Sequence, residues 1–149
     1  MRIQQFSDLL QAARQQPTPQ RLLFVFAGVE LPEDASPAQA ERFAAGEGGV
    51  LVPLMCVDRT PEELTSFEAL AQEASLTVAE MAQQAQAQQL PVPSHDWRMV
   101  FVAALSGDQQ SPSHEDAVEP LQRMVESIRQ GQLDRFIPFD RDGGVLSFA

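Results

Sequence analysis

Four polar residues stand just after apolar stretches of this sequence, where ligand-binding side chains of α/β proteins gather. They are Glu30, Asp58, Arg59 and Ser106. If the apolar stretches are parallel strands, these residues share the sheet edge at which open α/β sheets bind ligands. Carboxylate, guanidinium and hydroxyl groups at one edge could bind or transform a small polar molecule. Alternatively, Asp58 and Arg59 are ordinary polar residues of a loop that precedes a helix.

Thiol and imidazole groups do not form a recognisable site. Cys56 lies in the middle of an apolar stretch, so we expect a buried, structural thiol with a raised pKa. His95 and His114 are the two histidines, and neither belongs to an HExxH or CxxC pattern. We therefore expect no metal site, and His114 is expected at the surface near a helix start. Catalytic residues stay unassigned.

A glycine-rich loop at residues 46–49 does not have the context of a phosphate loop. Phosphate loops follow a strand and open a helix, where backbone N–H groups and the helix dipole face the anion. Here the glycines follow a predicted helix and precede a predicted strand, and the chain contains no lysine. The sequence therefore predicts no cofactor.

Three stretches are almost wholly apolar and predict strands that are covered on both faces. They are residues 21–28, 50–57 and 97–105. Segments with helical spacing lie between them. This order predicts one domain over residues 1–149 with an α/β fold, or α+β as the alternative. We expect a mixed, mainly parallel sheet of about five strands flanked by helices.

Helix-start signals place the helices. Ser36 and Thr60 each precede a proline and have Gln or Glu three residues later, which predicts two capped helices. The last helix is predicted over residues 119–130, because Pro120 fits a first turn better than a helix interior. A Gln/Ala-rich segment at about 75–93 is interpreted as a surface insertion.

Two apolar segments around the turn residues 140–144 predict a C-terminal β-hairpin. Its phenylalanines are Phe136, Phe139 and Phe148. They would form an apolar edge strand, and exposed edges of this kind tend to be paired or covered. The hairpin therefore predicts a homodimer.

The charge balance excludes several partners. The chain has 21 acidic residues against ten arginines, and its formal net charge is −11. Phosphate backbones and anionic membranes attract basic patches, so we expect neither nucleic acid nor membrane as a partner. No apolar run approaches the roughly 18 residues of a membrane span. With one cysteine and no signal-peptide pattern, the expected compartment is the cytoplasm.

The segments 21–28, 48–58 and 120–126 resemble a group of short uncharacterised proteobacterial α/β proteins. The resemblance implies a shared fold over most of the chain and excludes 75–93. Some members carry the label "ribonucleotide reductase subunit alpha". That activity needs several redox cysteines, or a tyrosyl radical with a di-iron set, and this chain has one cysteine and no tyrosine. The label is therefore not transferred to this chain.

Two functional hypotheses remain. The leading one is a non-catalytic cytoplasmic domain that acts through protein–protein contacts or self-association, because no nucleophile–base pair or cofactor motif is visible. The alternative is a small-molecule-binding protein or enzyme that uses Glu30, Asp58, Arg59 and Ser106.

Overall fold

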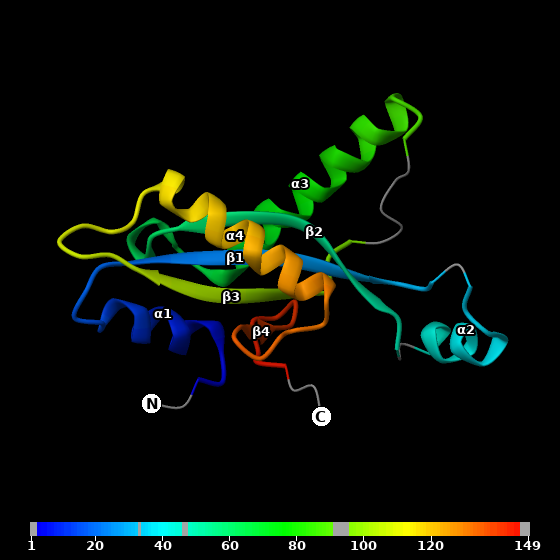
Figure 1. Ribbon diagram of the computed structural model, residues 1–149, viewed down its shortest axis with the longest axis horizontal. Helices are drawn as coiled ribbons and strands as arrows, with labels where there is room; N and C mark the ends of the chain where they lie inside the picture. The colour runs from blue at the N-terminus through cyan, green and yellow to red at the C-terminus, as the bar shows by residue number, and fades with distance from the viewer. Residues whose placement is uncertain (1–2, 33, 46–47, 91–95, 147–149) are drawn as a thin grey trace.

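A computed structural model describes residues 3–32, 34–45, 48–90 and 96–146, and it consists of one sheet with helices on both faces (Figure 1). The elements in chain order are α1 (Phe6–Arg14), β1 (Gln20–Glu30), α2 (Pro37–Ala44), β2 (Val50–Arg59), the 3-10 turn η1 (Pro61–Glu63), α3 (Phe67–Ala87), β3 (Met99–Ser106), α4 (His114–Arg129) and β4 (Ile137–Phe139).

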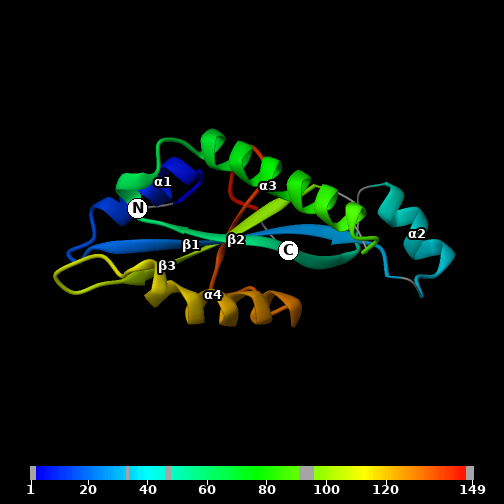
Figure 2. The same ribbon diagram turned by 90° about the horizontal axis from the view of Figure 1, so that it is seen from above.

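The sheet has four strands in the order β2-β1-β3-β4, and every neighbouring pair is antiparallel. The architecture is α+β, and the expectation of a mainly parallel sheet of about five strands is wrong. The reason lies in α2, which stands beyond the end of β1 and β2 (Figure 2). The chain turns back there, so β2 returns directly beside β1 instead of crossing over.

One face of the sheet packs against α1 and α3, which lie together on that side in Figure 2. Phe24 and Phe26 of β1 point to this face and are fully buried. The Phe6 ring of α1 lies 6.0 Å from the Phe24 ring, and Trp97 lies 4.9 Å from Phe26, edge to face. Aromatic pairs in this geometry add to the stabilisation from apolar burial.

The opposite face packs against α4 and the segment that follows it, through Leu133 and Phe136. Leu23, Val25 and Ala27 of β1 face Ala117, Leu121, Met124 and Ile128 of α4. The helical residues recur at spacings of three and four, which places them on one side of α4. A single helix covers less of the sheet than the pair on the other face, and this difference matters for the site described below.

Of the two predicted helix starts, the one at Ser36 is confirmed and the one at Thr60 begins only a 3-10 turn. Ser36 caps α2 through a capping box with Gln39, although α2 itself buries no residue. Thr60 forms a capping box with Glu63, but it caps only η1. Ser66 caps α3, which then continues unbroken to Ala87. Residues 75–87 of the proposed insertion are therefore part of a long helix, and 91–93 lie outside the described residues.

The last helix begins at His114, not at residue 119 as predicted. Ser113 and Asp116 form a capping box there, with Asp116 N–H donating to the Ser113 hydroxyl at 3.1 Å. Pro120 consequently lies inside the helix. It removes one backbone donor, which would have bonded to the carbonyl of Asp116. Asp116 is exposed, so water can satisfy that carbonyl.

The C-terminal segment turns back as predicted. Asp140 N–H donates to the Gly144 carbonyl, and Phe139 forms an antiparallel bridge with Val145. Phe139 is fully buried, however, and Phe148 lies outside the described residues. The expected phenylalanine-rich edge is therefore not exposed at Phe139, where the ring packs 5.6 Å from that of Phe6.

Arg141 ties this C-terminal turn to the rest of the molecule. Its guanidinium lies 4.6 Å from the centre of the Trp97 ring and donates to Asp96 Oδ2 at 2.9 Å. It also donates to the Trp97 carbonyl at 2.6 Å. Burial alone would raise the pKa of Asp96, but hydrogen bonds from Arg141, the Trp97 N–H and Ser75 hold it below its usual value.

Candidate functional site

The four residues predicted to share a ligand-binding edge do not come together. Glu30 pairs with Val50 at one end of the sheet. Asp58, Arg59 and Ser106 lie at the other end, because β2 and β3 both run antiparallel to β1. The predicted edge required three parallel strands, and the antiparallel sheet does not bring the four residues to one edge.

The three residues at the second end also point to different faces. Directly paired residues of antiparallel strands point the same way. Asp58 pairs with Leu23 and therefore faces α4, whereas Arg59 pairs with Leu22 and faces α3. Ser106 pairs with Gln20, which donates to its hydroxyl at 3.0 Å. Ser106 thus lies on the α1–α3 face, away from Asp58.

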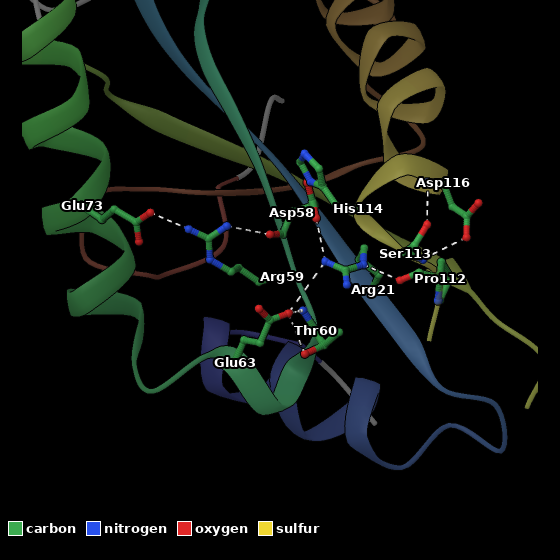
Figure 3. A network of polar contacts seen from close by, with 10 residues as sticks. All are labelled: Arg21, Asp58, Arg59, Thr60, Glu63, Glu73, Pro112, Ser113, His114 and Asp116. Carbon is green, nitrogen blue, oxygen red and sulfur yellow. Dashed lines mark hydrogen bonds and ion pairs between the residues drawn. The ribbon is translucent and has the colours of Figure 1, made fainter. Parts of the chain in front are cut away.

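Asp58 is instead the centre of a different cluster, drawn in Figure 3. Its side chain is only 4% exposed. Arg21 Nη1 lies 2.6 Å from Asp58 Oδ1, and His114 Nδ1 lies 2.6 Å from Oδ2. Arg21 also donates through Nε to the Pro112 carbonyl. A buried carboxylate is costly unless it is paired and hydrogen-bonded, and here both oxygens have partners.

His114 reaches Asp58 because it is the first residue of α4 after the Ser113 cap. A carboxylate only accepts hydrogen bonds, so Nδ1 of His114 carries the proton that joins the two groups. The imidazole remains 78% exposed. The contact therefore fixes the ring at the surface and holds the N-terminus of α4 against β2.

A second group of ion pairs lies on the α3 side. Arg59 bridges from β2 to α3 through an ion pair with Glu73 at 2.5 Å. Glu63 accepts from the Thr60 N–H at 2.8 Å, and this bond and the Thr60 hydroxyl lower the pKa of Glu63. Both carboxylates are substantially exposed, so these bonds position the chain after β2 more than they stabilise it.

A hollow of about 580 Å³ opens beside the Asp58 cluster, and we call it the β2–α4 groove. Its lining residues are Cys56, Val57, Asp58, Arg59, His114, Val118, Leu121, Gln122, Val125, Glu126 and Arg129. Four consecutive residues of β2 line it, although alternate residues of a strand point to opposite faces. The groove therefore runs along the outer side of β2, where both faces meet.

Cys56 is exposed in this groove, and the expectation that it is buried is wrong. The prediction failed because β2 is an edge strand: among the described strands, it pairs with β1 alone. Partial burial raises the pKa of the thiol, and the negative charge of Asp58 raises it further. The raised pKa agrees with the sequence-based expectation, and it lowers the fraction of reactive thiolate at neutral pH.

Within the described residues, no three histidine, cysteine or acidic side chains gather closely enough to hold a metal ion. None of the helices in those residues combines the length and apolar character that a membrane crossing needs. Of the glycine loop at 46–49, residues 46–47 lie outside the described part. Gly49 has a φ of +97°, and a Cβ there would lie 2.4 Å from a Val29 methyl, so its role is a tight turn.

Comparison with protein-family models, curated proteins and solved structures gave no match. The site must therefore be read from its own chemistry.

Sequence reasoning correctly expected His114 at the surface near a helix start, but it missed the contact of His114 with Asp58, the role of Arg21 and the groove stripe of α4. A usable signal was present in the Ser113 capping box and in the spacing of His114, Val118, Leu121 and Val125. Steps of four, three and four residues place these side chains along one side of a helix. Starting the helix at residue 119 hid that pattern.

Proposed function

We propose that this chain is a non-catalytic protein-binding domain whose docking surface is the outer edge of β2 together with the β2–α4 groove. The single observation that carries the proposal is that the groove follows this edge over four consecutive strand residues. A segment laid there can use the backbone of β2 and the side chains of α4 together. Addition of a strand to an exposed sheet edge is a common mode of peptide recognition.

The first support for the proposal is the open outer edge of β2. β2 has ten residues, and the first eight, residues 50–57, are all Val, Leu, Met, Cys or Pro. Among the described strands, only β1 pairs with it. An edge presents unpaired N–H and C=O groups that another chain can pair with. Proteins usually blunt such edges. Pro53 and the bulge at Leu54 blunt part of β2, but residues 55–59 stay regular and indicate a surface with a partner.

The apolar content of the groove supports it next. Val118 is 45% exposed although it lies on a helix face next to the core. Cys56 and Val125 lie alongside it in the lining. Covering this surface would bury apolar area that now contacts water, worth about 25 cal/mol per Å².

The chemistry of the groove favours binding over catalysis. Cys56 is the nucleophile that the lining offers, and the pKa of its thiol is raised by burial and by Asp58. Asp58 is committed to Arg21 and His114. A nucleophilic thiol needs a lowered pKa or an adjacent base. This environment acts in the opposite direction.

Self-association is a second way to use the same surface. Two copies could join their β2 edges about a two-fold axis into one continuous eight-stranded sheet. The phenylalanine-rich hairpin does not support a dimer, since Phe139 is buried. A homodimer, if formed, is therefore expected through β2.

The test uses Cys56 as a natural handle, because it is the only cysteine of the chain and lies in the groove. A maleimide photo-crosslinker on Cys56 is expected to capture a protein that then binds the purified, unlabelled domain. Val118→Gln should weaken that binding about fivefold or more, as loss of roughly 1 kcal/mol of apolar burial would.

Val145→Gln is the matched control, because Val145 is also an exposed valine, at 37%, and does not line the groove. It should leave binding unchanged. A crosslink between two copies would assign the surface to self-association. Equal binding by wild type and Val118→Gln, or no crosslink from Cys56, would contradict the proposal.

A further inference from the structure

We propose that the occupant of the β2–α4 groove is an extended, positively charged segment of another protein, in which basic and apolar residues alternate. This inference rests on the proposed function and specifies the chemistry of the partner. It is carried by the regular part of the β2 edge, by the apolar stripe of α4, and by the acidic side chains that border that stripe.

The regular part of the edge is short. Phe26 pairs with Met55 and Ala27 pairs with Pro53, so Leu54 is an extra residue that forms a bulge. Pro53 has no backbone N–H to donate. Bulges and prolines both interrupt pairing along an edge. A new strand can therefore pair with residues 55–59, of which 56–59 line the groove, provided that the Arg59 guanidinium releases the Asp58 carbonyl, to which it donates at 2.7 Å.

Alternation of the partner follows from the geometry of a strand. Side chains of an added strand point alternately toward α4 and toward the α3 side. Those that point toward α4 meet Val118, Leu121 and Val125, so apolar side chains fit there. Those on the other side lie near Glu63 and Glu73, two exposed carboxylates beside Arg59, so basic side chains fit there.

The sign of the charge follows from the border of the groove. Glu115, Glu119 and Glu126 of α4 are exposed and are spaced by four and seven residues, which places them on one side of the helix. The basic groups in the lining are already paired, Arg59 with Glu73 and Arg129 with Glu126. Glu115 and Glu119 have no ion pair within the described residues.

The same charges disfavour a second copy as the occupant. Each chain carries a net charge of −11, and a dimer through β2 would bring two acidic α4 borders together. A basic segment experiences attraction where a second copy experiences repulsion. The charge complementarity therefore selects a cationic partner.

The experiment measures fluorescence anisotropy with three labelled octapeptides that have blocked ends. The first alternates arginine and valine, the second alternates glutamate and valine, and the third alternates arginine and proline. The arginine–valine peptide is expected to bind at least about tenfold more tightly than either of the others. The glutamate peptide tests charge, and the proline peptide tests strand pairing at constant charge.

Two matched pairs of protein variants locate the binding site. Glu115→Gln/Glu119→Gln should weaken binding of the arginine–valine peptide about threefold or more, while Asp34→Asn/Glu41→Gln removes two exposed charges near α2 and should have a smaller effect. Val125→Gln, in the apolar stripe of the groove, should also weaken binding. Leu76→Gln, at an exposed position of α3, should not.

The outcomes separate this inference from the proposed function. Equal binding of the glutamate or the proline peptide would overturn the cationic strand while leaving a groove that binds proteins. A dimer in sedimentation that dissociates in Val118→Gln would overturn it in favour of a second copy. If no peptide binds and Cys56 also gives no crosslink in the earlier experiment, both proposals fail.

Discussion

Nδ1 of His114 lies 2.6 Å from Oδ2 of Asp58, so the first residue of α4 is bound to the edge strand through a buried carboxylate. The other oxygen of Asp58 lies 2.6 Å from Arg21 of β1. These contacts join three elements at one end of the β2–α4 groove. They fix the separation of β2 and α4 at that end of the groove.

Asp58→Ala should destabilise the fold by about 3 kcal/mol, because it leaves the Arg21 guanidinium, which is largely buried, without its carboxylate. Chemical denaturation measures this free energy of unfolding. Asp134→Ala removes an exposed aspartate and should cost less than about 0.5 kcal/mol. A similar, small cost for both variants would show that the Asp58 cluster does not stabilise the fold.

Cys56 should react with a neutral maleimide in the native protein without denaturant, because its side chain is exposed. The reaction should be slow at pH 7 and accelerate as the pH rises past the usual thiol pKa of about 8.5, since burial and Asp58 raise the pKa. Asp58→Asn should increase the rate at pH 7. If labelling required denaturant, Cys56 would be buried in the native protein, which would contradict this account.

The strands could be predicted from sequence, but their direction could not. Residues 22–28 are apolar throughout because β1 is covered by α1 and α3 on one face and by α4 on the other. A parallel strand of an α/β protein has the same pattern for the same reason. What distinguishes the antiparallel from the parallel arrangement is α2. None of its eight residues is buried, so it does not pack on the sheet as the crossover helix between two parallel strands must.

Sequence reasoning found one residue of the candidate site, Asp58, but not its partners, because strand direction decides which residues meet. Asp58 is buried and central, as a functional polar residue would be, but its partners Arg21 and His114 come from elements that only the antiparallel register brings together. Cys56 is exposed because β2 lies at the edge of the sheet, which depends on the strand order. Strand order is set by long-range packing and leaves no local signal in an apolar stretch.

Acid should destabilise the protein through Asp96, among other carboxylates. Burial by itself would raise its pKa, but Arg141, the Trp97 N–H and Ser75 hold it below the usual value. A lowered pKa in the folded state contributes stability above the unfolded pKa of about 3.9, and that contribution is lost as the pH falls through the folded value.

The thermal midpoint should therefore decrease below about pH 4. Asp96→Asn should lower the midpoint at pH 7 and weaken its decrease in acid. Asp142→Asn, at an exposed position of the same C-terminal turn, serves as the control. An unchanged acid profile in Asp96→Asn would show that the bonds to Arg141 are not maintained in solution.

Amide hydrogen exchange of β2 tests the docking surface most directly. In the free protein, alternate N–H groups of residues 55–59 point away from β1 and should exchange quickly, because β1 is the only described strand beside them. With saturating amounts of the partner captured through Cys56, these amides should slow at least about tenfold, while those of β4 remain unchanged. Protection confined to β4 or to α3, with no change along residues 55–59, would contradict the account.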